Sequence, residues 1–373
     1  MRIALVSTYG VKCGIATYTE HLAREITGDN DVVIFAEDCI NNGQQNFNTD
    51  LKFVRCFNRN SKDTRLIEAL RNFKPDVVHI QHEYGIFKDL TDLLEKVRHN
   101  FRGRTVMTLH TVNVANGFDL HNCSDYFIVH KELAKTHLEM TEKVKPEFLR
   151  MIPHGTLIVP HKPAEFARKK LGLPVDSKIV LSHAFFERRK NIDKIIKAVS
   201  DLKSETPIYY IHIGDIHPHI SEKNGEIYYR ECLRLIKELD IERHVRFLRS
   251  FVPDEELFYY LNACDVIVTL ENENYPKISA SGIMHTVAGK PVIASNVTNF
   301  TEFPDNSFYK IDINVESLKD AIREILSNPE LSEELVRNLL QYARETSWDK
   351  VAKEHLKLYT KCIEKATLRY IYT

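Results

Sequence analysis

Short apolar runs alternate with amphipathic stretches along most of this chain. Arg2–Ser7 is a continuous apolar run, and Gly14–Ile26 follows it with apolar residues at helical spacing. Further apolar runs stand at Asp76–Gln81 and Thr105–Leu109, and the alternation restarts at Lys178–Ser182. Runs that are apolar throughout are typical of parallel strands covered on both faces. The pattern therefore predicts an α/β protein with parallel sheets.

The same pattern predicts the remaining strands and helices. Further strands are predicted at Asp31–Ala36, Leu51–Arg55, Ser124–His130, Ile208–Ile213, Val245–Leu248, Asp265–Leu270 and Pro291–Ser295. Helices are predicted at Asp63–Phe73, Glu132–Met140, Ile192–Leu202, Tyr228–Leu239 and Asp254–Ala263, and the chain is helical in pattern from Val315 onward.

A proline-rich basic stretch divides the alternation into two halves. Pro160, Pro163 and Pro174 follow one another closely, as in a linker, so a hinge is predicted near residues 155–165. A length of 373 residues is enough for two domains with separate cores. The predicted domains are residues 1–158 and 159–352.

Composition and charge narrow the class of protein. The chain has 51 basic and 52 acidic residues, so its overall charge gives no reason to expect nucleic acid as a partner. Seven scattered cysteines form no CxxC pair, which favours reduced thiols over disulfides or zinc. The apolar N-terminal run is too short for a signal peptide, and no run approaches the roughly 20 residues of a membrane helix. These features indicate a cytoplasmic protein without an integral membrane segment.

Polar side chains follow two predicted strands of the first domain. His82, Glu83 and Tyr84 come after one strand, and His110 and Thr111 come after the next. Because ligands bind at the carboxyl ends of parallel strands, these residues are candidates for a binding site. A single histidine in such a place is more often structural, but two histidines beside a carboxylate favour function.

The turn after the first strand contains Gly10 and Gly14. It lacks the GxGxxG spacing of a dinucleotide site. The glycines at a helix start could let the backbone approach a phosphate or sugar, and a simple strand-to-helix turn explains them about equally well.

The candidate functional residues of the second domain lie in three loops. The loop HAFFERRKN places Arg188, Arg189 and Lys190 after a strand. The loop GDIHPHI follows another strand and contains Gly214 and His217. After the strand Asp265–Leu270, a helix is predicted to open near Ser279 and Ser281, and a helix N-terminus offers free N–H groups to anions. These loops predict an anion site at the carboxyl edge of the second sheet.

Several motifs resemble one known family. The segment AGKPVIASNVTNFTEF, preceded by ACDVIV, is similar to the donor-binding half of family-4 glycosyltransferases, which are retaining enzymes of the GT-B fold. KCGIATYTEHLA, QHEYGIF, TLHTV, IPHG and GEIYYRECL resemble a bacterial branch of that family. The resemblance implies two Rossmann-like doubly wound domains facing across a cleft. It also implies that a C-terminal helix, at about residues 353–373, packs back on the first domain.

The resemblance also implies roles for single residues. Lys190 matches a lysine that holds the donor phosphates, but Phe185 stands where the partner arginine is usual, so Arg188 and Arg189 are expected to supply that charge. The usual pair of glutamates would fall at Pro276 and Met284, which leaves other carboxylates to hold the donor. The expected donor-binding residues are Gly14, Arg188, Arg189, Lys190, Gly214, His217, Glu273, Ser279, Ser281, Gly282 and Glu302; the expected acceptor-binding residues are His82, Glu83 and Tyr84; the expected catalytic residues are His110 and Lys190.

The implied function is transfer of a sugar from a nucleotide-sugar donor to a carbohydrate or other hydroxyl acceptor, with retention and without a metal or other cofactor. Mannose from a GDP donor is one candidate. A glycoside phosphorylase, a sugar-nucleotide epimerase and a catalytically silent binding or regulatory subunit are the alternatives. The charge at Lys190 and the strand-end histidines favour an enzyme. The sequence leaves the oligomeric state open.

Overall fold

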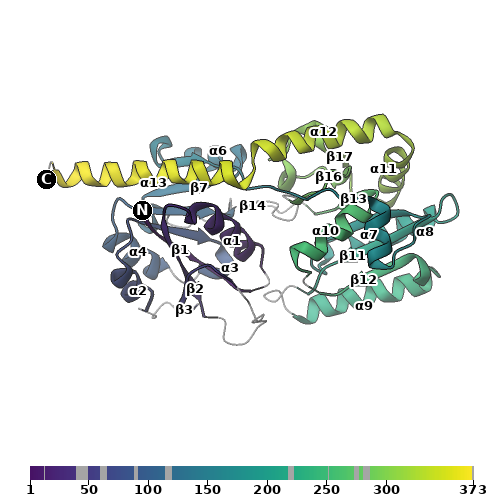
Figure 1. Ribbon diagram of the computed structural model, residues 1–373, viewed down its shortest axis with the longest axis horizontal. Coiled ribbons are helices and arrows are strands. Elements are labelled where there is room, and N and C mark those ends of the chain that lie inside the picture. The colour runs from purple at the N-terminus through teal and green to yellow at the C-terminus, as the bar shows by residue number, and fades with distance from the viewer. Residues whose placement is uncertain are drawn as a thin grey trace. The chain divides into compact units, whose positions relative to one another are not determined.

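The computed structural model divides the chain into two compact units. The first unit comprises Met1–Gly155, Asn274–Gly282 and Thr346–Thr373, and the second comprises Thr156–Glu273 and Ile283–Glu345 (Figure 1). The structure describes residues 1–11, 13–38, 49–58, 65–87, 91–113, 120–216, 222–250, 252–272, 277–279 and 286–371.

A parallel sheet of seven strands forms the centre of the first unit, in the order β3-β2-β1-β4-β5-β7-β8. Its strands are β1 (Arg2–Ser7), β2 (Asp31–Glu37), β3 (Phe53–Phe57), β4 (Val77–His82), β5 (Thr105–Leu109), β7 (Tyr126–Val129) and β8 (Leu149–Met151). Its helices are α1 (Gly14–Thr27), α2 (Arg65–Phe73), α3 (Tyr84–Phe87), α4 (Thr91–Asn100), α5 (Leu120–Cys123), α6 (Glu132–Met140), η1 (Pro146–Phe148) and α13 (Trp348–Ile371).

The two faces of the first sheet differ in chemistry. Val78 and Ile80 of β4 belong to an apolar core with residues of α2, α4 and α6. Side chains alternate along a strand, so His79 and Gln81 point to the other face. That face is covered by α1 and α13, and it buries His79 and Gln81 completely. The first sheet therefore has an apolar face and a face with buried polar groups.

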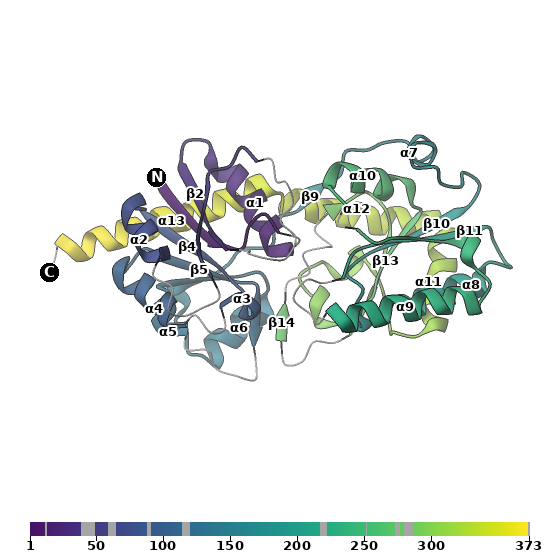
Figure 2. The same ribbon diagram turned by 90° about the horizontal axis from the view of Figure 1, so that it is seen from below.

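The C-terminal helix α13 packs against α1 within the first unit (Figures 1 and 2). Its first residue, Trp348, stacks on His21 and meets the ring of Tyr18 edge-on. A Cβ at Gly155 would lie 2.2 Å from the Trp348 ring, so only glycine fits at this position. The glycine of the IPHG motif thus has a packing role at the start of α13.

The second unit contains a parallel sheet of six strands, in the order β12-β11-β10-β13-β16-β17. Its strands are β10 (Lys178–His183), β11 (Ile208–Ile213), β12 (Val245–Leu248), β13 (Val266–Thr269), β16 (Val292–Ser295) and β17 (Tyr309–Ile311), with a separate pair formed by β9 (Leu157–Ile158) and β15 (Thr286–Val287). Its helices are α7 (Ala164–Leu171), η2 (Arg188–Lys190), α8 (Ile192–Leu202), α9 (Glu222–Glu238), η3 (Glu242–His244), α10 (Asp254–Ala263), η5 (Thr298–Phe300), η6 (Asp305–Ser307), α11 (Val315–Ser327) and α12 (Pro329–Glu345).

Helices cover both faces of the second sheet. Leu181 of β10 packs in one core with residues of α7, α10 and α12, while its neighbour Val180 packs in another with residues of α8, α9 and α11. Figure 2 shows these two groups of helices on opposite sides of the sheet. Burial on both faces explains why the strand reads as a continuous apolar run.

Most elements lie where the sequence pattern predicts them. The strand predicted at Thr105–Leu109 and the helices predicted at Ile192–Leu202 and Asp254–Ala263 are confirmed with the same bounds. The helix predicted from Tyr228 begins earlier, at Glu222.

The helix expected near Ser279 is wrong at that residue. Lys277–Ser279 form the strand β14, which pairs antiparallel with β6 (Thr111–Asn113) of the first unit. Strand pairing between segments so far apart in the chain cannot be read from local pattern.

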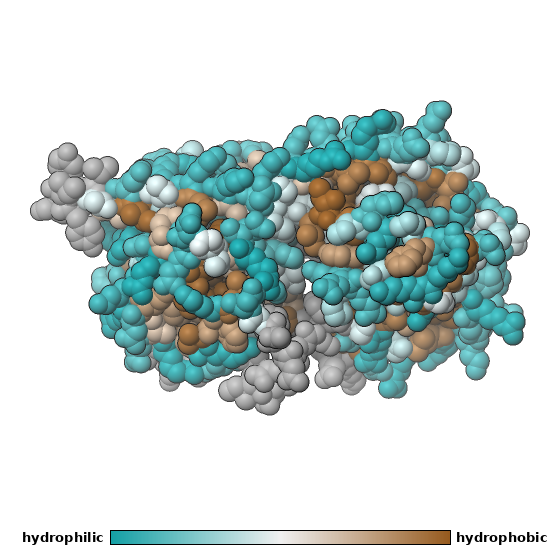
Figure 3. Space-filling model, viewed as in Figure 1, coloured by the Kyte–Doolittle hydropathy of each residue, from teal (hydrophilic) through white to brown (hydrophobic). Residues whose placement is uncertain are grey.

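The surface is largely polar. Hydrophilic residues cover most of the face drawn in Figure 3. Within the part of the chain that the structure describes, no helix combines the length and the apolar character needed to cross a membrane.

Candidate functional site

The strand order of the second unit creates a switch point between β10 and β13. From β10 the chain continues outward through β11 and β12, and it then returns to place β13 on the other side of β10. Loops that leave two neighbouring strands in opposite directions open a crevice at the carboxyl edge of the sheet, where α/β proteins bind ligands. The loops after β10 and β13 are therefore the first place to look for a site.

Charged side chains from these two loops meet in one cluster. Lys190 Nζ lies 2.6 Å from Glu271 Oε2, and the Arg189 guanidinium contacts both Glu271 and, at 2.5 Å, Glu187 Oε2. Both carboxylate side chains are nearly buried, with 6% and 7% of their surface exposed, and Lys190 is 12% exposed. Two cations and two carboxylates thus share a poorly solvated position at the switch point.

Hydrogen bonds of the backbone hold the two loops together. The Asn272 amide donates to the Arg189 carbonyl at 2.9 Å, and the Asn191 side chain donates to Asn272 Oδ1 at the same distance. The Glu271 amide donates to Ser295 Oγ, which donates back to the Glu271 carbonyl, each at 2.9 Å. The position of the charged cluster is therefore fixed by three strands of the sheet.

Burial changes the protonation chemistry of the cluster. Burial, and then the neighbouring Arg189 guanidinium, lower the pKa of Lys190 to about 7. The Glu187 carboxylate opposes this shift, and Lys190 Nζ also donates to Glu271 Oε2 at 2.6 Å. His183, the last residue of β10, has its pKa lowered to about 4 by burial and by the charge of Lys190. At neutral pH, His183 is a neutral imidazole beside a lysine that is close to losing its proton.

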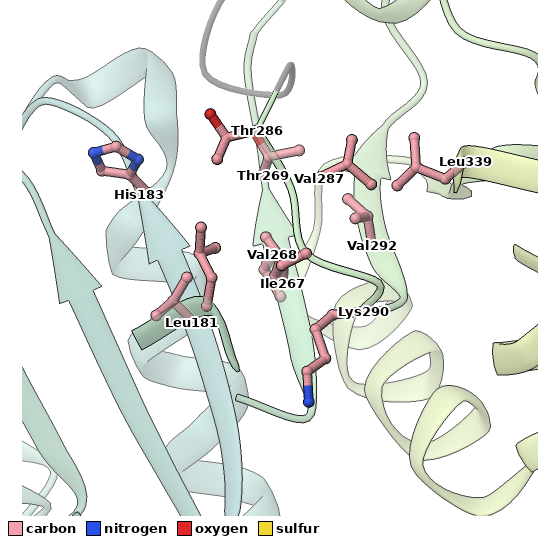
Figure 4. Close-up of a pocket in the computed structure, with 12 residues that line it drawn as sticks. Leu181, His183, Ile267, Val268, Thr269, Thr286, Val287, Lys290, Val292 and Leu339 are labelled. Atoms are coloured by element: carbon pink, nitrogen blue, oxygen red, sulfur yellow. The ribbon is translucent and has the colours of Figure 1, made fainter. Parts of the chain in front are cut away.

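A small cavity lies beside His183 inside the second unit (Figure 4). It is lined mainly by apolar side chains of β10, β13, β15 and β16. Its volume of about 20 Å³ holds about one water molecule, so it is too small for a sugar or a nucleotide.

The structure separates the predicted basic residues. Arg188 pairs with Glu231 of α9 at 2.6 Å and lies over the ring of Tyr228. Arg188 is thus paired with a residue of α9, whereas Arg189 and Lys190 belong to the charged cluster.

The backbone amide of Gly214, a predicted donor-binding residue, has a partner within the protein. This amide donates to the Leu248 carbonyl at 3.0 Å. A Cβ at Gly214 would lie 1.7 Å from the Ala184 carbonyl oxygen, so the glycine allows two strand-end loops to pack closely. The residue is buried and has a structural explanation.

The other predicted donor residues have varied positions. Gly14 is exposed at the start of α1, and a Cβ there would meet no atom within 4 Å. Glu302 is half-buried on the loop after η5. Ser279 ends β14 of the first unit. His217, Glu273, Ser281 and Gly282 lie outside the described residues.

The first unit has an equivalent switch point between β1 and β4. Glu83 and Tyr84, directly after β4, are half-buried, and Glu83 Oε2 accepts a hydrogen bond of 2.7 Å from Thr111 Oγ1. His82 is different, since its side chain is fully buried and its ring stacks on Phe87. His82, a predicted acceptor-binding residue, therefore differs from Glu83 and Tyr84, because its ring points into the core.

His110 ends a buried hydrogen-bond network on the polar face of the first sheet. Its Nε2 donates to Gln81 Oε1 at 2.9 Å, which leaves Nδ1 as the acceptor nitrogen. His79 lies next to Gln81 and bonds Thr108 Oγ1 at 2.7 Å and Tyr359 of α13 at 2.6 Å. Burial, followed by the neighbouring histidines, holds the pKa of His110 well below its usual range. His110 is thus a neutral imidazole in a fixed orientation.

Sequence reasoning missed Gln81 and His183 and gave no role to Glu271. Each becomes visible only when strand neighbours are known, because their partners come from other strands. The position of His183 at the end of a strand, beside a basic loop, was the available signal. Among the residues that the structure describes, no group of three or more His, Cys, Asp or Glu could hold a metal ion.

Comparisons with known proteins find similarity to glycosyltransferases. Residues 163–345, most of them in the second unit, match the family model of glycosyl transferases group 1. A D-inositol 3-phosphate glycosyltransferase of Nocardioides sp. is 23% identical over 250 residues, which cover 63% of this chain and 53% of that protein. The chain spans about half the length of these curated relatives.

Solved structures match almost the whole chain. Sucrose-phosphate synthase from Thermosynechococcus elongatus has a TM-score of 0.76 and 20% identity, covering 98% of this chain and 100% of that one. Anabaena Alr3699/HepE in complex with UDP and glucose has a TM-score of 0.73 and 13% identity, covering 97% and 100%. At this identity the likeness shows the fold alone. The expected α/β architecture with two Rossmann-like units of the GT-B type is confirmed.

Proposed function

We propose that this protein transfers a hexose from a nucleotide-sugar donor to a hydroxyl acceptor, because residues 163–345 match the family model of glycosyl transferases group 1. The observation that carries the proposal is the cluster of Arg189, Lys190 and Glu271 at the switch point of the second sheet. A nucleoside diphosphate is an anion, and the two cations there are fixed by the loops that hold them.

In the proposed reaction, the bond between the anomeric carbon and the phosphate oxygen breaks. The electron pair leaves with the nucleoside diphosphate, whose negative charge grows as the bond breaks. Arg189 and Lys190 stabilise this charge in a site where little water competes with them. The acceptor oxygen forms the new bond to the anomeric carbon and gives up its proton. Since the two side chains supply the positive charge, the proposal includes no metal.

The first unit supplies the acceptor side of the proposal. Glu83 and Tyr84 are open to solvent at the carboxyl edge of its sheet, where they can hydrogen-bond a hydroxyl group. His110 is neutral and held by Gln81, so it can serve as a hydrogen-bond partner for a bound sugar. Retention of configuration and mannose as the sugar belong to the proposal through family resemblance alone.

A thermal-unfolding screen tests the donor class. We expect GDP, UDP or ADP at 100 times its Kd to raise the free energy of unfolding by about 2.7 kcal/mol. The Lys190→Ala variant should lose this stabilisation. If orthophosphate with a sugar 1-phosphate stabilises the protein and no nucleoside diphosphate does, a phosphorylase replaces the transferase. If no donor-type ligand stabilises it, a silent binding subunit is favoured.

Substitutions on the first unit should separate two kinetic roles. His110→Asn keeps a polar group near Gln81 but removes the imidazole, so we expect kcat to fall while the affinity for the donor stays nearly unchanged. Glu83→Gln keeps the size of the side chain but removes its charge, and we expect it mainly to raise the acceptor KM.

Thr111→Val is the matched control for Glu83, because it removes their hydrogen bond and keeps the carboxylate. Its acceptor KM should change less than that of Glu83→Gln. If His110→Asn lowers the melting temperature in step with activity, or leaves kcat unchanged in a stable protein, His110 has a structural role only.

A further inference from the structure

Another pocket lies in the first unit, at the opposite edge of the sheet from His110 and Glu83. It is lined by Tyr126 and Phe127, the first residues of β7, so it opens at the amino end of that strand. The loop after α6, the helix α4 and the helix α13 supply its other walls. Its volume is about 220 Å³, which corresponds to about seven water molecules.

The walls of this pocket are rich in positive charge. Lys143, Lys145 and Lys365 line it, and no ion pair joins any of them to a carboxylate within the described part of the chain. Lys365 Nζ lies 5.8 Å from the centre of the Phe148 ring, which also lines the pocket. Three lysine residues therefore line a space the size of a small molecule.

The one carboxylate among the lining residues does not offset these lysines. Asp125 pairs with Arg98 at 3.2 Å. Its other oxygen accepts hydrogen bonds from the Gly103 amide at 2.7 Å and from Thr105 Oγ1 at 2.6 Å. The charge of Asp125 is thus compensated by partners of its own, and the three lysines keep their net charge.

The charge extends one helical turn along α13. Lys361 precedes Lys365 by four residues, and its pKa is lowered by burial, then by Arg150 and Lys365. Repulsion among these cations is the cost of this arrangement, and the Glu147 carboxylate offsets only part of it at Lys361. A bound anion would relieve that repulsion.

We propose that this pocket binds a small phosphate monoester. A phosphate monoester carries between about 1.5 and 2 negative charges at pH 7, which matches the charge of three lysines in the pocket wall better than a single carboxylate does. The remaining volume accommodates a few carbon atoms, and the Phe148 ring gives them an apolar wall. The site is independent of the proposed donor site, because its residues belong to the first unit.

Equilibrium dialysis of the full chain with labelled glycerol 3-phosphate tests the proposal. We expect Lys143→Gln/Lys365→Gln to weaken binding at least tenfold, because each substitution removes a charge-assisted contact. Lys96→Gln/Lys197→Gln is the matched control, since it removes the same charge from exposed positions outside the pocket, and its affinity should stay within twofold of the wild type. Unchanged melting temperatures would show that both double variants are folded.

A third variant separates the two anion sites. Lys190→Ala removes the donor-site cation and should leave the pocket's affinity for glycerol 3-phosphate intact, whereas it should abolish stabilisation by nucleoside diphosphates. Binding that is lost in Lys190→Ala and kept in Lys143→Gln/Lys365→Gln would overturn the pocket proposal.

Sedimentation with vesicles distinguishes the source of the phosphate. Vesicles of phosphatidylcholine with phosphatidic acid present the same monoester on a membrane surface. Binding to these vesicles that depends on Lys143 and Lys365, without binding of free glycerol 3-phosphate, assigns the site to a lipid headgroup. Absence of binding to both probes at millimolar concentration would overturn the proposal.

Discussion

Replacing Lys190 with alanine should lower kcat about 10² to 10³-fold, which is the usual effect of removing one preorganised donor that stabilises developing charge. The expected loss of rate follows from the position of Lys190. Lys190 Nζ is held at the carboxyl edge of β10 by Glu271, with 12% of its side chain exposed, so its charge acts where water competes poorly. Initial rates with saturating donor and acceptor measure the effect.

The alanine variant also disturbs a buried ion pair, so stability needs a control. Removing one partner of such a pair costs about 3 to 5 kcal/mol when the other charge is left without compensation. Glu271 keeps its contact with Arg189, which should reduce that cost. In Lys190→Ala/Glu271→Gln both charges are gone and the fold should recover. A kcat that recovers with the fold would exclude a chemical role for Lys190.

The pH dependence of kcat/KM tests the role of Lys190 independently. The lowered pKa of about 7 means that the ammonium form of Lys190 is lost as the pH rises through 7. Because kcat/KM reports the free enzyme, we expect it to fall with an apparent pKa near 7. Lys190→Arg keeps its charge at all these pH values and should remove this alkaline limb. Glu271→Gln removes the carboxylate that favours the ammonium, so it should move the limb to lower pH.

The sequence predicts the fold well because local pattern and tertiary burial agree in this chain. The run Lys178–Ser182 is apolar throughout, and the structure buries Val180 and Leu181 in separate cores on the two faces of β10. The same agreement makes the loop after β10 easy to locate, with Lys190 on it. In contrast, Ser279 lies in β14 because of pairing with β6, more than 160 residues earlier, and no local pattern reports such a contact.

The candidate site is harder to predict, because its geometry depends on strand neighbours. Glu271 faces Lys190 only because β13 lies beside β10. His82 ends a strand like His110, yet alternation along β4 turns its ring toward Phe87 and the apolar core. Gly214 resembles a ligand-binding glycine in its position after a strand, and the carbonyl of Ala184 supplies the actual constraint. In each case the deciding neighbour is distant in the chain.

Acid should unfold the first unit before the second. Among the described residues with a resolved shift, burial lowers the pKa of four histidines in the first unit and of two in the second. In the first unit these are His79, His82, His110 and His355; in the second they are His183 and His212. Below the ordinary pKa of 6.5 the unfolded chain binds protons at these residues and the folded chain does not. The free energy of unfolding therefore falls as the pH decreases, until the pH reaches the folded-state pKa.

Each such histidine costs about 1.4 kcal/mol of stability per pH unit below 6.5. Four histidines should thus make the stability of the first unit about twice as sensitive to pH as that of the second. Near pH 5 the lost free energy of unfolding is comparable to the roughly 5 to 15 kcal/mol of a typical domain. The chain's single tryptophan, Trp348, is buried in the first unit and reports its unfolding by fluorescence. Far-ultraviolet circular dichroism reports both units. We expect the fluorescence change to precede the loss of the remaining circular dichroism signal.

Substitutions of single histidines decide whether burial of these rings is the cause. His355→Gln should lower the slope of stability against pH by one proton, since the variant retains a polar group near Tyr18 but does not titrate. His99→Gln, at an exposed position of α4, is the matched control and should leave the slope unchanged. If the wild-type fluorescence stays constant down to pH 4, or if both variants keep the wild-type slope, the neutral histidines are not what limits acid stability. A reduced slope in His355→Gln alone would connect the polar face under α13 directly to the stability of the unit that carries His110.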